Sequence, residues 1–492
     1  MLHISSLPSR FGIGDLGPGA LKFADFLSQA KQTIWQILPL NPTDAINNHS
    51  PYSSISAYAA NSLFISPELL ADDGFLSQED LRSAELSSER VDYAAVSSRK
   101  AGLFAKAFDN FKNSKEKNEY KKFCGQNSDW LEDFGLFVAL KEYYKGQVWS
   151  DWPVDLRDRD KDCLKAVRLE LAEKIEKEKF LQYIFFKQWK ALKDYCNKRG
   201  VAIIGDIPIY VNYDSADAWQ GPQNFKLDKD KRLEFVAGVP PDYFCKTGQR
   251  WGNPVFCWSQ IKKDKFSWWL KRVKHNLALF DLLRIDHFRG FVAYWEIPAA
   301  HESAVKGKWV KAPAEDFFKA LLKNFSKESF IAEDLGVITA DVKKIIKEFG
   351  FSGMKILMFA FGEENPLHPY LPHNYIENCV VYTGTHDNNT ARGWFESEAD
   401  AQSKERLLRY MGFEPDASRI NWDFIRLAMM SVAKFAITPM QDILGLNGAA
   451  RMNLPSTSSG NWGWRLFEDQ LTPDLANKIS EMTRMYARSP RL

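Results

Sequence analysis

A repeated unit constrains the fold of this chain more than any other feature: an amphipathic helix precedes a short apolar strand that ends in a polar side chain. In the clearest copy, apolar residues recur at helical spacing over 181–196, Gly200 follows, and the run VAII at 201–204 leads into Asp206. Glycine is common just past a helix, and an unbroken apolar run is typical of a strand covered on both faces. The unit therefore predicts βαβ connections and a parallel sheet.

The unit recurs often enough to close a barrel. Candidate strands lie near 2–5, 33–39, 201–205, 279–285, 329–333, 353–358, 379–383 and 435–440. We predict an α/β fold, a (β/α)8 TIM barrel that forms a single catalytic unit over 1–492. Two connections are too long for simple crossovers, and they predict a helix-rich insertion at about 41–180 and a loop-rich insertion at about 207–278.

A doubly wound open sheet is the alternative fold. It requires a glycine-rich phosphate loop directly after an early strand. Residues 12–17 (GIGDLG) match the G-x-G-x-x-G pattern but follow no strand directly. A match outside its structural context is weak, so the barrel is favoured.

Composition and charge exclude several classes of protein. The 65 Lys and Arg against 63 Asp and Glu give a net charge of +2, which offers no electrostatic footprint for nucleic acid or an anionic membrane. No uncharged apolar stretch reaches about 18 residues, and the six cysteines lack C-x-x-C spacing. We expect a cytoplasmic monomer or homodimer with free thiols, no cofactor and no metal ion.

Three carboxylic acids follow predicted strands: Asp286, Glu333 and Asp387. In a barrel, the carboxyl ends of the strands build the active site. Clustered carboxyls cannot all ionise freely, so one should hold its proton near neutral pH. Glycoside chemistry needs this separation, with one acid for the leaving oxygen and one nucleophile or base. Arg284 points to the same side as Asp286 because it lies two residues earlier on a strand.

The residues around these acids resemble the catalytic motifs of the amylomaltase family, the 4-α-glucanotransferases of glycoside hydrolase family 77. The motifs are LRIDHFRG at 283–290, AEDLG at 332–336 and GTHDN at 384–388. Further matching segments follow in order along almost the whole chain. They include GDIPIYV at 205–211, GVPPDYF at 238–244, GQRWGNP at 248–254 and NLP at 453–455.

The resemblance implies transfer of an α-1,4-glucan segment to the 4-position of glucose or of another α-1,4-glucan. The implied partners are thus α-1,4-glucans, maltooligosaccharides and glucose. The implied mechanism is a retaining double displacement through a covalent glycosyl-enzyme. It implies that Asp286 is the nucleophile, that Glu333 is the general acid and then the base, and that Asp387 holds sugar hydroxyls. The implied substrate-binding residues are Arg284, His386, Asp206, Tyr58, Ser56, Trp251, Tyr243 and Asn461.

Two other functions remain as alternatives. An α-glucan hydrolase of the amylase type uses the same three acids, with water in place of the acceptor sugar. A non-catalytic glucan-binding barrel is expected to lack one of the acids, and all three are present here.

Overall fold

A seven-stranded, entirely parallel sheet forms the centre of the protein, in the order β1-β2-β5-β8-β9-β10-β11. The computed structural model describes residues 1–114, 117–241, 246–457 and 459–489. The predicted barrel is confirmed, and its strands match the predicted positions to within a few residues. The strands are β1 (Ile34–Gln36), β2 (Ala202–Ile207), β5 (Leu282–Ile285), β8 (Phe330–Ala332), β9 (Ser352–Ile356), β10 (Cys379–Tyr382) and β11 (Phe435–Ile437).

The first residues of the chain close the barrel between its first and last strands. The prediction of a strand at 2–5 is wrong. The Leu2 amide donates to the Gln36 carbonyl at the end of β1, and the Met1 amino group donates to the Thr438 carbonyl just past β11. Residues 1 and 2 thus fill the gap between the first and last strands. A strand cannot continue because Ile4–Ser6 form a 3-10 turn that the Leu7 amide closes on the Ile4 carbonyl.

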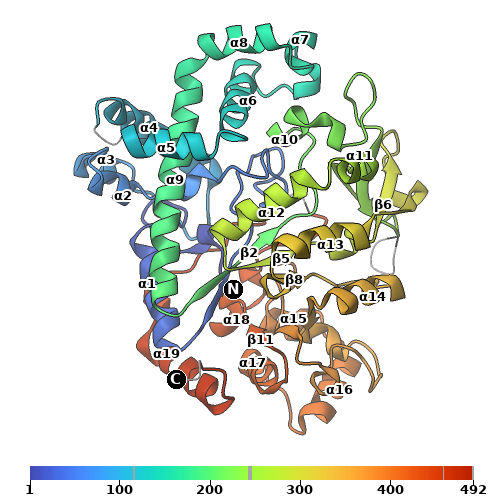
Figure 1. Cartoon of the computed structure of the whole chain (residues 1–492). Coiled ribbons are helices and arrows are strands. Elements are labelled where there is room, and N and C mark those ends of the chain that lie inside the picture. Colours follow the sequence, from blue (N-terminus) through green and yellow to red (C-terminus); the bar gives the residue numbers. More distant parts are fainter. Residues whose placement is uncertain (115–116, 242–245, 458, 490–492) are drawn as a thin grey trace.

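Helices cover the outside of the barrel (Figure 1). The predicted helical stripes are confirmed, and Gly350, at φ +71°, ends the helix before β9 in the left-handed conformation that favours glycine. The helices that precede β1, β2, β5, β8 and β9 are α1 (Pro18–Gln29), α9 (Ala172–Lys198), α12 (Ser267–Leu279), α13 (Ala314–Asn324) and α14 (Ala340–Phe349). Those around β11 are α15 (Ala391–Ser397), α16 (Ala401–Met411), α17 (Ile420–Met430), α18 (Met440–Ile443) and α19 (Pro473–Met485).

The long connection between β1 and β2 is helical. In Figure 1 its helices α6, α7 and α8 lie at the end of the molecule opposite α17 and α19. Its helices before α9 are α2 (Pro67–Asp72), α3 (Gln78–Ser83), α4 (Tyr93–Lys112), α5 (Lys117–Gln126), α6 (Leu131–Tyr143), α7 (Val154–Arg157) and α8 (Lys161–Glu170).

A second, four-stranded antiparallel sheet lies beside the barrel, in the order β4-β3-β6-β7. Two of its strands, β3 and β4, lie in the connection between β2 and β5, and the other two, β6 and β7, lie in the connection between β5 and β8. The strands are β3 (Phe235–Val239), β4 (Gln249–Pro254), β6 (Ala293–Pro298) and β7 (Lys308–Lys311), and the short helices beside them are α10 (Ala216–Gln220) and α11 (Trp258–Lys263).

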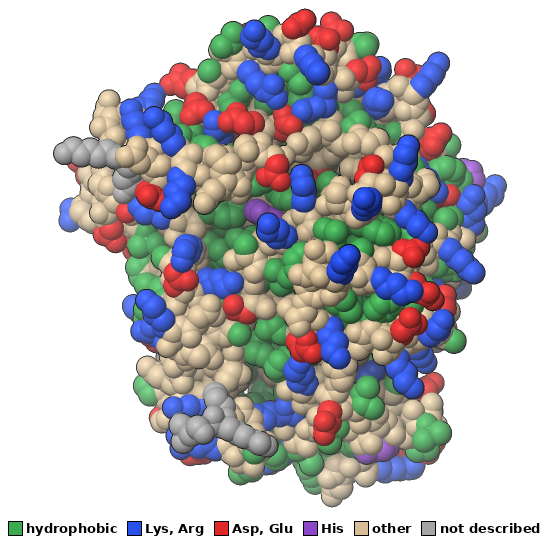
Figure 2. Space-filling view, viewed as in Figure 1, with side chains coloured by type: hydrophobic (Ala, Val, Ile, Leu, Met, Phe, Trp, Pro, Cys, Tyr) green, Lys and Arg blue, Asp and Glu red, His purple; other side chains and the backbone are tan. Residues whose placement is uncertain are grey.

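The surface carries charges of both signs. In Figure 2, basic and acidic side chains alternate across the visible face, in keeping with the net charge of +2. Within the ranges that the structure describes, no helix combines the length and the apolar character that crossing a bilayer would require.

Candidate active site

A buried arginine joins two strands at the carboxyl end of the barrel. Arg284 of β5 contacts Asp206 of β2, with 2.6 Å between Nη1 and Oδ2, and Asp286 just past β5, with 2.9 Å between Nη1 and Oδ1. The side chains of Arg284 and Asp206 are 5% and 0% exposed, whereas that of Asp286 is 25% exposed. One buried cation therefore fixes two carboxylates, of which only Asp286 has an open side.

Glu333 follows β8, the next strand along the sheet, so it lies beside the end of β5. Both oxygens of its carboxyl group accept backbone hydrogen bonds of 2.8 Å, Oε2 from the His287 amide and Oε1 from the Leu335 amide. His287 directly follows Asp286 and has a left-handed backbone, φ +46°. The turn after Asp286 thus orients Glu333 directly.

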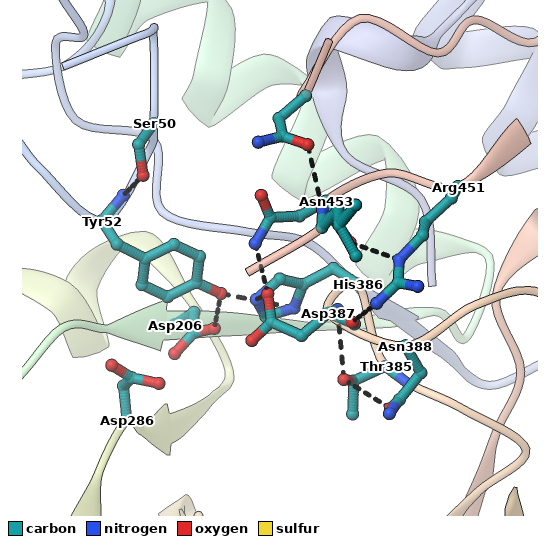
Figure 3. A network of polar contacts seen from close by, with 12 residues as sticks. Ser50, Tyr52, Asp206, Asp286, Thr385, His386, Asp387, Asn388, Arg451 and Asn453 are labelled. Carbon is teal, nitrogen blue, oxygen red and sulfur yellow. Dashed lines mark hydrogen bonds and ion pairs between the residues drawn. The ribbon is translucent and has the colours of Figure 1, made fainter. Parts of the chain in front are cut away.

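Asp387 and His386 follow β10 and complete the cluster (Figure 3). Asn453 Nδ2 donates to Asp387 Oδ1 at 2.6 Å, and Arg451 donates to the Asp387 carbonyl at 2.5 Å. The Asn453 amide also donates to the His386 carbonyl at 3.0 Å. A late loop of the chain therefore holds both residues of this pair.

Tyr52 connects the two halves of the cluster. Its hydroxyl donates to Asp206 Oδ2 at 2.7 Å and lies 3.5 Å from His386 Nδ1, and its ring stacks on the His386 ring at 5.0 Å (Figure 3). Tyr52 belongs to the loop after β1, so this contact spans the barrel mouth from β2 to β10.

The acids differ in their electrostatic surroundings. Burial raises the pKa of Glu333 to about 7, against the effect of Arg284 and with a further rise from the charge of Asp286. The two backbone hydrogen bonds to Glu333 also oppose the rise, and Glu333 keeps its proton up to about pH 7. Burial also raises the pKa of Asp286, and there the Arg284 guanidinium opposes the rise. Asp286 has the direct cationic contact that favours its ionised form.

Trp251 and Asn461 lie near this cluster without contacting its carboxylates. Trp251 of β4 sets its ring against the His287 ring, edge to face, with 4.8 Å between centroids. Asn461 accepts from the Leu454 amide at 2.9 Å and donates to Thr457 Oγ1 at 3.0 Å, so it shapes the loop that carries Asn453.

Ser56 and Tyr58 have other contacts. Ser56 Oγ accepts from the amides of Tyr58 and Ala59 at 3.1 and 3.0 Å and stabilises a turn. Tyr58 is buried and packs against Trp130 and His275. Tyr243 lies outside the described residues.

Three residues that contact the cluster are not among the predicted site residues: Tyr52, Arg451 and Asn453. Tyr52 lies in the loop after the strand predicted at 33–39, and Asn453 lies in the NLP segment that matches the family. Arg451 lies just before the NLP segment and carried no signal of its own.

A parallel barrel that gathers several acids at its carboxyl rim has its active site where barrel enzymes have theirs, and it offers the pair of carboxyl groups that glycosidic-bond chemistry requires. The family model of the 4-alpha-glucanotransferases of glycoside hydrolase family 77 matches residues 2–470. The chain belongs to this family, and it is an enzyme of the glucanotransferase class.

Individual relatives agree with this assignment along nearly the whole chain. The 4-alpha-glucanotransferase of Synechocystis sp. is 47% identical, over 99% of this chain and 97% of the relative. That of Aquifex aeolicus is 47% identical over 95% of each. Among solved structures, the amylomaltase of Streptococcus agalactiae in complex with acarbose has a TM-score of 0.96 and 38% identity, and the match covers 99% and 98% of the two chains.

Proposed function

We propose that this chain transfers α-1,4-glucan segments by retaining double displacement, with Asp286 as nucleophile, Glu333 as acid and base, and Asp387 as a ligand of the sugar hydroxyls. The observation that carries the proposal is that two neighbouring acids, Asp286 and Glu333, have different electrostatic surroundings. Asp286 contacts the Arg284 guanidinium at 2.9 Å, whereas burial raises the pKa of Glu333 to about 7. One group is thus suited to attack and the other to give a proton.

In the first step, a carboxylate oxygen of Asp286 bonds to the anomeric carbon of the donor. The bond from that carbon to the glycosidic oxygen breaks, and the Glu333 proton moves to the leaving oxygen. The departing saccharide carries the new hydroxyl group. The donor segment remains as an ester of Asp286 with inverted configuration.

In the second step, the Glu333 carboxylate takes the proton from the 4-hydroxyl of an acceptor sugar. The acceptor oxygen bonds to the anomeric carbon, and the bond to Asp286 breaks. The second inversion restores the α configuration, and both acids return to their starting state.

Two of the predicted subsite residues, His386 and Trp251, have surroundings that suit this chemistry. Burial lowers the pKa of His386, so its imidazole is neutral at pH 7 and can share hydrogen bonds with a hydroxyl group. Trp251 is 37% exposed beside the turn that follows Asp286, where a flat ring can cover the apolar face of a sugar.

The acceptor distinguishes a glucanotransferase, which uses a sugar, from an α-glucan hydrolase, which uses water. Incubation with maltotriose is expected to yield glucose together with a ladder of longer maltodextrins, resolved by chromatography. Maltose and glucose without longer products would mean that water is the acceptor and would contradict the proposal. No products, in a preparation that binds glucans, would favour the non-catalytic barrel.

The rate of transfer should fall as the pH rises through about 7. Glu333 must be protonated in the free enzyme, and burial raises its pKa to about 7, so the acid form is present below that pH and lost above it. The measurement is kcat/KM for maltotriose against pH. With α-maltosyl fluoride, whose leaving group needs no proton, the first burst of fluoride release should lack this fall. The same fall with both donors would contradict the role of Glu333.

Several further expectations stay predictions. They are the cytoplasmic location, the monomeric or dimeric state, and the absence of nucleic-acid partners. We also propose that 41–180 and 207–278 are insertions into one catalytic barrel, since β1, β2, β5 and the later strands follow the chain order around the sheet.

A further inference from the structure

Three consecutive residues after Asp286 bind the segment that contains Glu333. The His287 amide donates to Glu333 Oε2 at 2.8 Å, the Phe288 amide donates to the Glu333 carbonyl at 3.2 Å, and Arg289 Nη1 donates to the Val337 carbonyl. The first two contacts hold Glu333 itself. The third reaches four residues further along, so the turn fixes both ends of the segment 333–337, here called the acid loop.

The far end of the acid loop has little packing of its own, whereas Leu335 in its middle packs against the core and the Asp334 carboxylate accepts from the Met354 amide at 2.6 Å. Gly336 and Val337 are exposed, and Gly336 has a left-handed backbone, φ +75°. Yet this loop supplies the Leu335 amide that donates to Glu333 Oε1. The Asp334 contact with β9 holds the loop before that donor, and the Arg289 contact with the Val337 carbonyl holds it beyond the donor.

Arg289 is in turn fixed by the second sheet. Its guanidinium carbon lies 3.8 Å from the ring centroid of Trp309 on β7, a cation–π contact. Arg289 is buried, whereas Trp309 is 41% exposed and covers it. Arg289 thus connects the antiparallel sheet beside the barrel to the acid loop.

We propose that Arg289, covered by Trp309, is a positioning residue that holds the acid loop so that Glu333 is aimed at the leaving oxygen. The inference rests on the proposed role of Glu333. Arg289 acts through the loop backbone, so its loss should weaken proton transfer and leave the attack by Asp286 intact.

Two donors separate these steps. Disproportionation of maltotriose needs the proton from Glu333, whereas the burst of fluoride released from α-maltosyl fluoride needs only the attack by Asp286. Arg289→Met keeps the length of the side chain and removes the donor. We expect it to lower the maltotriose rate about 10- to 100-fold, the scale of a misplaced catalytic group, and to change the fluoride burst less than about two-fold.

Companion variants test each contact. Arg289→Lys keeps a donor for the Val337 carbonyl and should recover part of the maltotriose rate. Trp309→Phe keeps a ring over the guanidinium and should stay near the native rate, while Trp309→Ala should resemble Arg289→Met. The matched control is Arg488→Met, which removes an arginine that also binds backbone carbonyls, those of Met429 and Ala433, near the amino end of β11. It should leave the ratio of the two rates unchanged.

The outcomes are distinct. If Arg289→Met lowers both rates equally, or neither, Arg289 does not position the acid and the inference is overturned. Glu333→Gln reports separately on the proposed function: it should abolish maltotriose transfer and spare the fluoride burst. If Glu333→Gln loses both equally, the role of Glu333 itself is wrong. The fluoride burst also shows that each variant is folded, because it requires an intact Asp286 site.

Discussion

Asp286→Asn is expected to lower transfer from maltotriose by about 10⁴-fold or more, because a neutral amide cannot form the glycosyl ester. The fold should survive, since the Arg284 guanidinium keeps its contact with Asp206 at 2.6 Å. Binding of a maltooligosaccharide should therefore persist. The measurements are the rate of glucose release and calorimetric titration with maltotetraose.

A matched control for Asp286→Asn lies at the other end of β5. Asp281 lies just before β5, whereas Asp286 lies just after it. The Asp281 carboxylate accepts from the Ile203 amide, at the end of the barrel opposite Asp286. Asp281→Asn should keep transfer within a few-fold of the native rate, because it leaves the catalytic rim unchanged. Retention of a tenth of the native activity by Asp286→Asn, in protein free of the native enzyme, would contradict its role as nucleophile.

Arg284→Met should cause the largest loss of stability, about 3–5 kcal/mol in the free energy of unfolding at neutral pH. The change removes the cation shared by Asp206 and Asp286 and leaves two carboxylates without it. Transfer should be lost as well, since Asp286 then lacks the contact that favours its ionised form. Urea unfolding, followed by circular dichroism, measures the stability.

The size of this loss should depend on pH. Burial raises the pKa of Asp206 to about 7 even with Arg284 in place, and removal of Arg284 raises it further. A carboxyl whose pKa is higher in the folded than in the unfolded state costs stability above its unfolded pKa, and the cost grows until the pH passes the folded pKa. The deficit of Arg284→Met should therefore be larger at about pH 8 than at about pH 5.

A second substitution checks the cause. Arg284→Met combined with Asp206→Asn replaces one buried carboxylate by a neutral amide, and it should regain part of the lost stability. An equal deficit at both pH values, or no recovery in the double variant, would show that the arginine does not offset the two charges.

Local periodicity carried enough information to predict the barrel and the positions of its acids. Asp206, Arg284, Asp286 and Glu333 all lie on or just after strands whose apolar runs were unambiguous in the sequence. Parallel strands bring their carboxyl ends to one rim, so the strand pattern alone predicts that these groups meet. The eighth strand position was harder, because two residues fill it and a 3-10 turn follows immediately.

Contacts between distant loops could not be predicted in the same way. Asn453 binds the Asp387 carboxylate from 66 positions away, and Tyr52 binds Asp206 from 154 positions away. Nothing in local sequence distinguishes Tyr52 from Tyr58, yet the first lies between Asp206 and His386 and the second packs against Trp130. The left-handed backbone of His287 is likewise set by its surroundings, because it is rare for a residue other than glycine.

In the proposed mechanism, Asp286 carries the donor segment as a covalent ester. Glu333→Gln, incubated with α-maltosyl fluoride, should form this ester and then stall, because the second step lacks its base. Mass spectrometry of the acid-quenched and digested protein should find one added maltosyl group on the peptide that contains Asp286. Fluoride release with no adduct on any peptide, or an adduct on another residue, would contradict the mechanism.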